Sequence, residues 1–186
     1  MELIQYPQER CDPLLAGRIV ELEQTAWPGD GEAEAFPSAP DTYVTSFLWL
    51  EGAMPVCHVG VRSSILHHKG QTYAAYGLSE VVTHPAFRGR GLASEGIRRA
   101  AQFIMERRAD VSIFTCAPER VPFYTRGGWR AVKGACLVGG TLRRPFRSDS
   151  LHLVTMMMFL SPKGRLHQAD FEHTDIVLEL GENQLW

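Results

Sequence analysis

The stretch GLSEVVTHPAFRGRGLA, residues 77–93, decides the fold. The valines and the threonine of its first half, at 81–83, predict a strand. Gly89 and Gly91 predict a tight turn, and Leu92 begins a periodicity typical of a helix. Glycines let the main chain approach a ligand closely. The free N–H groups that begin a helix, its dipole, Arg88 and Arg90 together favour an anion. The stretch therefore predicts a diphosphate site, the alternative being a surface turn with two solvated arginines.

Periodicity and turn residues outside this stretch predict a mixed α/β chain. A helix is expected from Asp12-Pro13, an N-cap followed by proline, to the stop at Pro28-Gly29. Further helices are expected over 92–108 and 121–126, and strands over 43–50, 55–66, 72–83, 111–117, 129–132, 152–160 and 176–180. Strand 72–83, its helix and strand 111–117 predict one crossover unit. The length of 186 residues predicts a single domain, 1–186.

Charge is close to balanced overall and strongly partitioned along the chain. The net charge is −2, but residues 1–87 carry −7, residues 88–147 carry +9 and residues 148–186 carry −4. The near-neutral total disfavours a nucleic-acid partner. The partition predicts that the middle block handles an anion and that another block handles something else.

Cysteines and apolar runs indicate the compartment. The four cysteines are far apart and form no CxxC pair, and no apolar run approaches the ~20 residues that span a bilayer. We expect reduced, buried thiols in a soluble cytoplasmic protein with no membrane partner.

Two blocks resemble a known family. Arg88-x-x-Gly91-x-Ala93 matches the Q/R-x-x-G-x-G/A signature of GNAT acetyltransferases, and Phe123-Tyr124 followed by Gly127-Gly128-Trp129 resembles that family's second signature. The resemblance covers residues 43–132 most firmly. It implies a GNAT fold of class α/β (α+β): a mixed, mostly antiparallel central sheet flanked by helices, with a V-shaped splay at the cofactor strand.

The resemblance also implies the donor, acetyl-CoA, and no metal. Backbone groups of one strand end would pair with the pantetheine and polarise the thioester: Val81, Val82 and Thr83. The turn that follows would hold the pyrophosphate: Arg88, Gly89, Arg90, Gly91, Leu92 and Ala93.

The acceptor is expected to be a cation. Residues 19–61 contain seven acids and no lysine or arginine, although such a run is also typical of a solvated surface. The loop 26–30 and the final tryptophan resemble aminoglycoside 2′-N-acetyltransferases, and Gly-Leu-Ser-Glu-Val looks closest to the kasugamycin-acetylating branch. That resemblance implies a resistance enzyme and acceptor contacts at Asp30, Ser79, Glu80, Thr115, Asp149 and Trp186, the last offering a ring and a carboxylate.

One departure from the family pattern concerns the base. Counted back from Arg88, the family's strand glutamate falls on Ser79, and Glu80 is its neighbour. Adjacent strand residues point to opposite faces, so Glu80 faces the acceptor only if the strand is bulged or shifted. The hypothesis is that Glu80 takes the amine proton, directly or through water, in a ternary complex, and that Tyr124 protonates the CoA thiolate.

Other functions stay open at this point. The same fold could acetylate another small amine or a protein lysine, or bind CoA without turnover. The late strands could complete the sheet or pair with a second subunit, which would give a homodimer.

Overall fold

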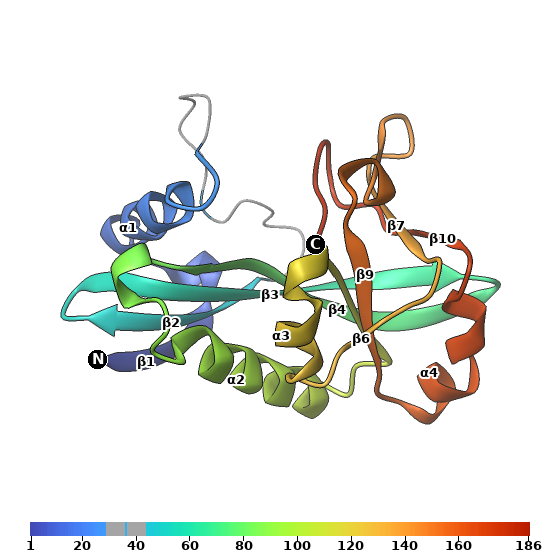
Figure 1. Ribbon diagram of the computed structural model, residues 1–186, viewed down its shortest axis with the longest axis horizontal. Coiled ribbons are helices and arrows are strands. Elements are labelled where there is room, and N and C mark those ends of the chain that lie inside the picture. Colours follow the sequence, from blue (N-terminus) through green and yellow to red (C-terminus); the bar gives the residue numbers. More distant parts are fainter. Residues whose placement is uncertain (29–35, 37–43) are drawn as a thin grey trace. The chain divides into compact units, whose positions relative to one another are not determined.

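A computed structural model of the protein describes residues 1–28, 36 and 44–186 (Figure 1). The helices are α1 (Pro13–Gln24), α2 (Leu92–Glu106), α3 (Val121–Thr125) and α4 (Pro162–Leu166). The strands are β1 (Glu2–Pro7), β2 (Thr45–Glu51), β3 (Met54–His68), β4 (Gln71–Thr83), β5 (Val111–Cys116), β6 (Arg130–Ala131), β7 (Cys136–Gly140), β8 (Pro145–Arg147), β9 (Val154–Phe159) and β10 (Asp175–Val177). No described helix is long and apolar enough to cross a membrane.

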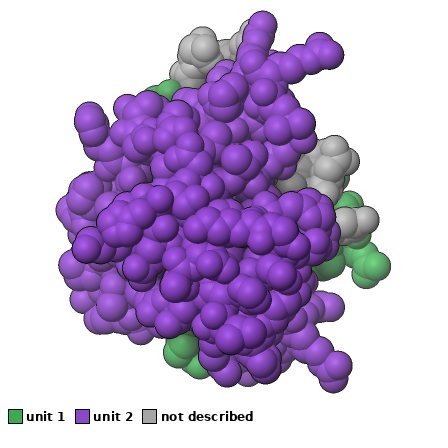
Figure 2. Space-filling view, turned by 90° about the vertical axis from the view of Figure 1, so that its right-hand side faces the viewer, with its two compact units in different colours: residues 1–62, 78–100 green, residues 63–77, 101–186 purple. Residues whose placement is uncertain are grey.

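The chain forms two compact units (Figure 2). The first holds residues 1–62 and 78–100, and the second holds residues 63–77 and 101–186. Strands β3 and β4 and helix α2 each contribute residues to both. The predicted fold class, a mixed and mostly antiparallel sheet flanked by helices, is confirmed. The single domain over 1–186 stays a prediction.

Local signals set the helix that opens the first unit. The Asp12 carboxylate accepts hydrogen bonds from the N–H groups of Leu14 and Leu15, and Pro13 is the first helical residue. Helix α1 buries Ile19, Leu22 and Glu23. The Asp-Pro signal thus predicted where α1 begins, whereas the helix ends at Gln24, before the predicted stop at Pro28.

The strands of the first unit follow the order β1-β2-β3-β4. Helices α1 and α2 cover opposite faces of this part of the sheet (Figure 1). Successive residues of β3 contact the two helices in turn, because strand side chains alternate between faces. His58 contacts Glu23 of α1, and a Cβ on Gly96 of α2 would lie 2.9 Å from Cγ2 of the next residue, Val59. The N-terminus of α2 is anchored further by Trp49, whose indole N–H donates to the carbonyl of Leu92 at 3.0 Å.

The predicted crossover is confirmed, and its last strand, β5, belongs to the second unit. Strand β5 follows α2 and pairs parallel with β4 through Ala75–Val111 and Tyr76–Ser112, as the sequence predicted. Strand β9 then pairs antiparallel with β5, and β6 with β9. A separate sheet, β10-β7-β8, was not predicted.

Aromatic side chains fill the core of the second unit. Trp129 is buried, stacks edge-on against Phe114 and donates its indole N–H to Ser112 at 2.9 Å. Phe114 also meets Tyr124 edge-on, with ring centroids 4.8 Å apart. These contacts fix helix α3 against β5, because Tyr124 belongs to α3 and Phe114 to β5.

The cysteines are free, as predicted, and three of the four are buried. Burial raises the pKa of Cys57 and Cys116 to about 11, so both are thiols at neutral pH. Cys11 is half-buried beside the hydroxyl of Tyr6.

Candidate functional site

The turn before α2 is open and built on two left-handed glycines. Gly89 has φ +76° and Gly91 has φ +78°, and no atom lies within 4 Å of where a Cβ would stand on either. The carbonyl of Gly91 accepts the first helical hydrogen bond, from Glu95. The N–H groups of Leu92 and Ala93 therefore precede the helical ladder and are available to a ligand. This open cradle at the start of a 15-residue helix fits a diphosphate such as that of CoA.

Arg88 and Arg90 are folded back onto the turn. Arg88 donates its Nε–H to the carbonyl of Thr83, and Arg90 donates to the carbonyl of Ala86 while lying 4.7 Å from the ring centre of Phe87. These contacts use part of each guanidinium's donor set of five N–H groups. The remaining N–H groups of each guanidinium can still bind an anion. The two arginines therefore both stabilise the shape of the turn and give it positive charge.

Strand β4 is bulged at Glu80. Its φ is +52°, in the left-handed region, whereas regular strand residues have negative φ. A Cβ on Gly60 would lie 2.7 Å from Ser79 Oγ and 3.0 Å from Glu80 Oε2, so two consecutive side chains face the same neighbour. Regular alternation forbids that. The bulge that the predicted role of Glu80 requires is therefore present, on the face covered by α1.

Gly60 is the residue that leaves room for this bulge. An alanine there would also meet the carbonyl oxygen of Ser79 at 2.9 Å, which cannot rotate away. We expect Gly60→Ala to lower the free energy of unfolding by about 2 kcal/mol in urea denaturation. We also expect kcat to fall, because Glu80 must move. In Gly17→Ala, where nothing lies within 4 Å, stability should instead rise by about 0.5–1 kcal/mol.

Both oxygens of the Glu80 carboxylate are engaged. Arg62 donates to Oε1 at 2.5 Å and Gln8 donates to Oε2 at 3.3 Å. The Glu80 side chain is 13% exposed and that of Arg62 is 3% exposed. Donors to both oxygens favour the ionised form, which is the form that can take a proton from an amine.

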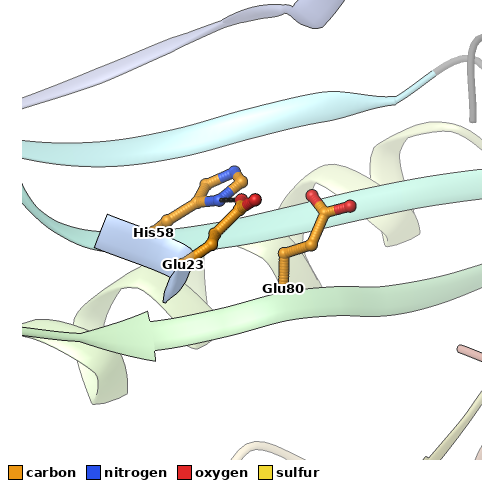
Figure 3. A group of neighbouring side chains, drawn as sticks. All are labelled: Glu23, His58 and Glu80. Carbon is orange, nitrogen blue, oxygen red and sulfur yellow. Dashed lines mark hydrogen bonds and ion pairs between the residues drawn. The ribbon is translucent and has the colours of Figure 1, made fainter. Parts of the chain in front are cut away.

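Two further titratable groups lie beside Glu80 (Figure 3). Glu23 and His58 are joined by a 2.8 Å contact, and with Glu80 they bring three ligand atoms within 4.8 Å of one another. An imidazole and two carboxylates are ligands that zinc accepts. Each is already bonded here, however, His58 to Glu23 and Glu80 to Arg62, so a cation would have to displace a buried guanidinium.

The remaining predicted residues of strand β4 are close to this group in the first unit. The hydroxyl of Ser79 is buried and forms no hydrogen bond within the described ranges. Val82 is buried, and Thr83 donates its hydroxyl to the sulfur of Cys57 at 3.2 Å. The contacts of Val81, Val82 and Thr83 with pantetheine stay predictions.

Tyr124 lies in the second unit, on helix α3, and is 9% exposed. Burial raises its pKa to about 12, with the nearby Cys116 raising it further and Arg120 opposing the rise. The phenol is therefore protonated at neutral pH and is a hydrogen-bond donor. This state suits the predicted acid role, which stays a prediction.

The structure brings Thr115 and Trp186 together. Thr115 donates its main-chain N–H and its hydroxyl to the main-chain oxygen of Trp186, at 2.7 and 2.6 Å. The ring of Trp186 lies against Gly77 and is buried, and its indole N–H has no partner among the described residues. The predicted stacking of this ring on an acceptor would require it to leave this position, and the Thr115 hydroxyl is occupied by Trp186.

The two remaining acidic predictions differ in outcome. Asp149 is on the surface, where the guanidinium of Arg147 donates hydrogen bonds to both of its carboxylate oxygens, at 3.0 and 2.8 Å. These hydrogen bonds hold the pKa of the Asp149 carboxyl below its usual range. Asp149 is thus part of an ion pair rather than a free carboxylate awaiting a cation. Asp30 lies outside the described residues.

Sequence reasoning missed Glu23, His58, Ser46 and Gln8 as parts of the site. A weak signal existed: Glu23 shares the helical face that buries Ile19. Likewise, His58 and Arg62 share one face of β3 by the period of two. Neither pattern reveals that these faces meet, because that depends on tertiary packing.

Comparison with protein families identifies an acetyltransferase domain in this chain. The sequence description "Acetyltransferase (GNAT) domain" matches residues 20–132, which contain β4, the glycine turn and Tyr124. Comparison with curated proteins gave no match.

Solved structures share the fold at low identity. A probable N-acyltransferase from Enterococcus faecalis V583 is 18% identical with a TM-score of 0.59; the match covers 71% of this chain and 33% of that one. Escherichia coli ElaA is 12% identical with a TM-score of 0.60, over 84% and 97% of the two chains. An aminoglycoside 6′-N-acetyltransferase complexed with coenzyme A is 13% identical with a TM-score of 0.57, over 86% and 98%.

Proposed function

Because the chain belongs to the acetyltransferase (GNAT) family, we propose that its acceptor is an amino group of an aminoglycoside, the 2′-amino group, and that kasugamycin is the type of substrate. Family membership makes the protein an acetyl-CoA-dependent N-acetyltransferase. The acceptor and the resulting antibiotic resistance are the proposal. The observation that carries it is the mostly buried Glu80 carboxylate on the bulge of β4.

Charge complementarity supports a cationic acceptor. The amine of an aminoglycoside, with a reference pKa near ~8, is mostly protonated at neutral pH. An ionised carboxylate attracts and orients such a cation. The acidic run 19–61 and the resemblance of loop 26–30 to aminoglycoside 2′-N-acetyltransferases point the same way. One structure of the same fold is named for an aminoglycoside reaction, at the 6′ position.

Each residue has a defined part in the proposed reaction. Acetyl-CoA supplies the activated acetyl group. The turn Arg88–Ala93 binds its diphosphate, and the main-chain N–H near Val82 donates to the carbonyl oxygen under attack. Glu80 takes the proton of the amine, directly or through water, and Tyr124 donates a proton to the departing sulfur. The amine attacks in a ternary complex, without an acyl-enzyme.

Replacement of Tyr124 by phenylalanine tests the acid role. A phenol with a pKa of about 12 gives up a proton to a thiolate against the pKa difference, so its contribution lies below the usual range for acid catalysis. We expect Tyr124→Phe to lower kcat about tenfold and to leave KM for the acceptor unchanged. Steady-state kinetics with thiol detection measure this. Unchanged turnover would remove the acid role.

The acceptor is identified by thiol release from acetyl-CoA with a panel of amines. The panel contains kasugamycin, kanamycin-type aminoglycosides, a polyamine and a lysine peptide. We expect turnover with aminoglycosides and the highest kcat/KM with kasugamycin, with NMR of the product locating the acetyl group. Turnover restricted to polyamines or peptides would refute the antibiotic assignment. Absence of release with every amine would indicate a CoA-binding domain without turnover.

A further inference from the structure

A continuous chain of side-chain hydrogen bonds leads away from Glu80 through the first unit. Gln8 Nε2 contacts Glu80 Oε2 at 3.3 Å and Ser46 Oγ at 2.9 Å. Ser46 Oγ contacts His58 Nε2 at 2.8 Å, and His58 Nδ1 contacts Glu23 Oε1 at 2.8 Å. Its members lie directly after β1, on β2, on β3 and on α1, and Gln8, Ser46, His58 and Glu23 are all buried.

Hydrogen-bond chemistry gives this chain one consistent direction. An ionised Glu23 accepts from His58 Nδ1–H, which leaves Nε2 as an acceptor. The hydroxyl of Ser46 then donates to Nε2, and its oxygen accepts from the Gln8 amide. The second N–H of that amide is directed to Glu80. The orientation of the Gln8 amide is therefore set by Glu23, three side chains away.

We propose that Glu23, His58, Ser46 and Gln8 are positioning residues that orient the Glu80 carboxylate for its reaction. The inference rests on the proposed function, in which Glu80 accepts the amine proton. Arg62 holds one carboxylate oxygen and the Gln8 amide holds the other. Two donors on fixed supports keep the carboxylate ionised and leave it little rotational freedom.

Ser46, His58 and Glu23 also have the spacing of a nucleophile, a base and an orienting acid. A nucleophilic serine must reach the thioester, however, and Ser46 and His58 are both 0% exposed. The Ser46 oxygen also already contacts Gln8 and His58. The burial of Ser46 therefore favours a supporting role for this residue over a role as the nucleophile that forms an acyl-enzyme.

The Gln8 amide limits what the chain can transmit. An amide N–H donates a hydrogen bond but does not readily pass a proton on, so the chain orients Glu80 and does not conduct protons away from it. Among the described residues, the titratable groups near these hydrogen bonds are Arg62 and His58 on β3, Glu23 on α1 and Tyr6 on β1. Tyr6 lies opposite Ser46 in the pairing of β1 with β2. If the chain is broken, Glu80 loses a donor, and protonation of Glu80 then occurs at higher pH.

The experiment compares two glutamates of α1. Glu23→Gln removes the charge that sets the chain, whereas Glu21→Gln changes an exposed glutamate of the same helix. The activity of both is measured with acetyl-CoA and the acceptor found in the panel, over roughly pH 5 to 9. Glu23→Gln also removes a carboxylate charge within 4.8 Å of Glu80, which favours the ionised form of Glu80, so the acid limb of kcat should move up less in Glu23→Gln than in Gln8→Met. KM for acetyl-CoA should not change, and Glu21→Gln should follow the parent.

A second variant keeps the inference testable if Glu23→Gln fails to fold. Gln8→Met preserves the volume of the side chain but removes both amide N–H groups. It should move the acid limb of kcat up by about one pH unit, with kcat about tenfold lower on that limb, because Glu80 loses a donor and no charge near it changes. An acid limb at its original pH in Gln8→Met overturns the positioning role.

Failure of the proposed function gives a different result. If Glu80→Gln retains full turnover, the base role of Glu80 is wrong, whatever the other variants do. If Glu80→Gln loses turnover while Gln8→Met and Glu23→Gln keep the parent's pH profile, only the positioning role is wrong.

Discussion

Replacement of Glu80 by glutamine is expected to lower kcat about a hundredfold at neutral pH, the low end of the range for loss of a general base. Glutamine matches the size of glutamate and can still accept from Arg62, but its amide faces the Gln8 amide donor to donor. It cannot take a proton from an ammonium group. KM for acetyl-CoA should stay within about twofold, because the diphosphate turn contains none of these residues.

The deficit of Glu80→Gln should shrink at alkaline pH. An amine with a pKa near ~8 is mostly neutral at about pH 9, so the reaction then needs less help from a base. Initial rates at pH 7 and pH 9 measure this, with Glu21→Gln as the control and circular dichroism as the test of folding. A variant with the kcat of the parent at pH 7 would contradict the base role, and water would have to take the proton unaided.

Local signals in the sequence were sufficient for the elements around the site. Asp12-Pro13 fixes the start of α1, because both the cap and the proline act within one turn. Lys69 and Gly70 take positive φ at the tip of the β3–β4 hairpin, between the two strands predicted over 55–66 and 72–83. The Gly89–Gly91 turn and the parallel pairing of β4 with β5 follow from the same short-range patterns.

The site itself depends on information that no short stretch carries. The family pattern placed Glu80 on the wrong side of a regular strand, and only its positive φ shows that the strand is bulged. The contact of Glu23 with His58 joins residues 35 positions apart, and that of Gln8 with Glu80 joins residues 72 apart. The acceptor contact of Asp149 came from the family resemblance alone, which carries no information about its ion pair with Arg147.

Short strands with weak patterns were missed for a related reason. Strand β7 has the sequence CLVGG, and two terminal glycines disfavour a strand prediction. It is nevertheless fully buried, because β8 and β10 pair with it on either side. Pairing partners that are distant in the sequence, rather than local propensity, stabilise it.

Introduction of a single methyl group at Gly77 is expected to cause a large loss of stability. A Cβ there would lie 2.2 Å from Cε3 of Trp186 and 2.6 Å from the carbonyl oxygen of Ile113. Both distances are far below van der Waals contact, and one of the atoms belongs to the main chain. We expect Gly77→Ala to lower the free energy of unfolding by about 3 kcal/mol in urea denaturation, the upper part of the range for overpacking.

A double-mutant cycle with Trp186→Ala separates the two clashes. Trp186→Ala alone should destabilise the protein, because it leaves a cavity beside Gly77. The double variant Gly77→Ala/Trp186→Ala should be more stable than the sum of the single effects by about 1–2 kcal/mol, since the methyl group then enters that cavity. Strict additivity would mean that the ring of Trp186 does not pack on Gly77 in solution. In that case the ring is free of β4, and the acceptor stacking predicted for it regains its physical basis.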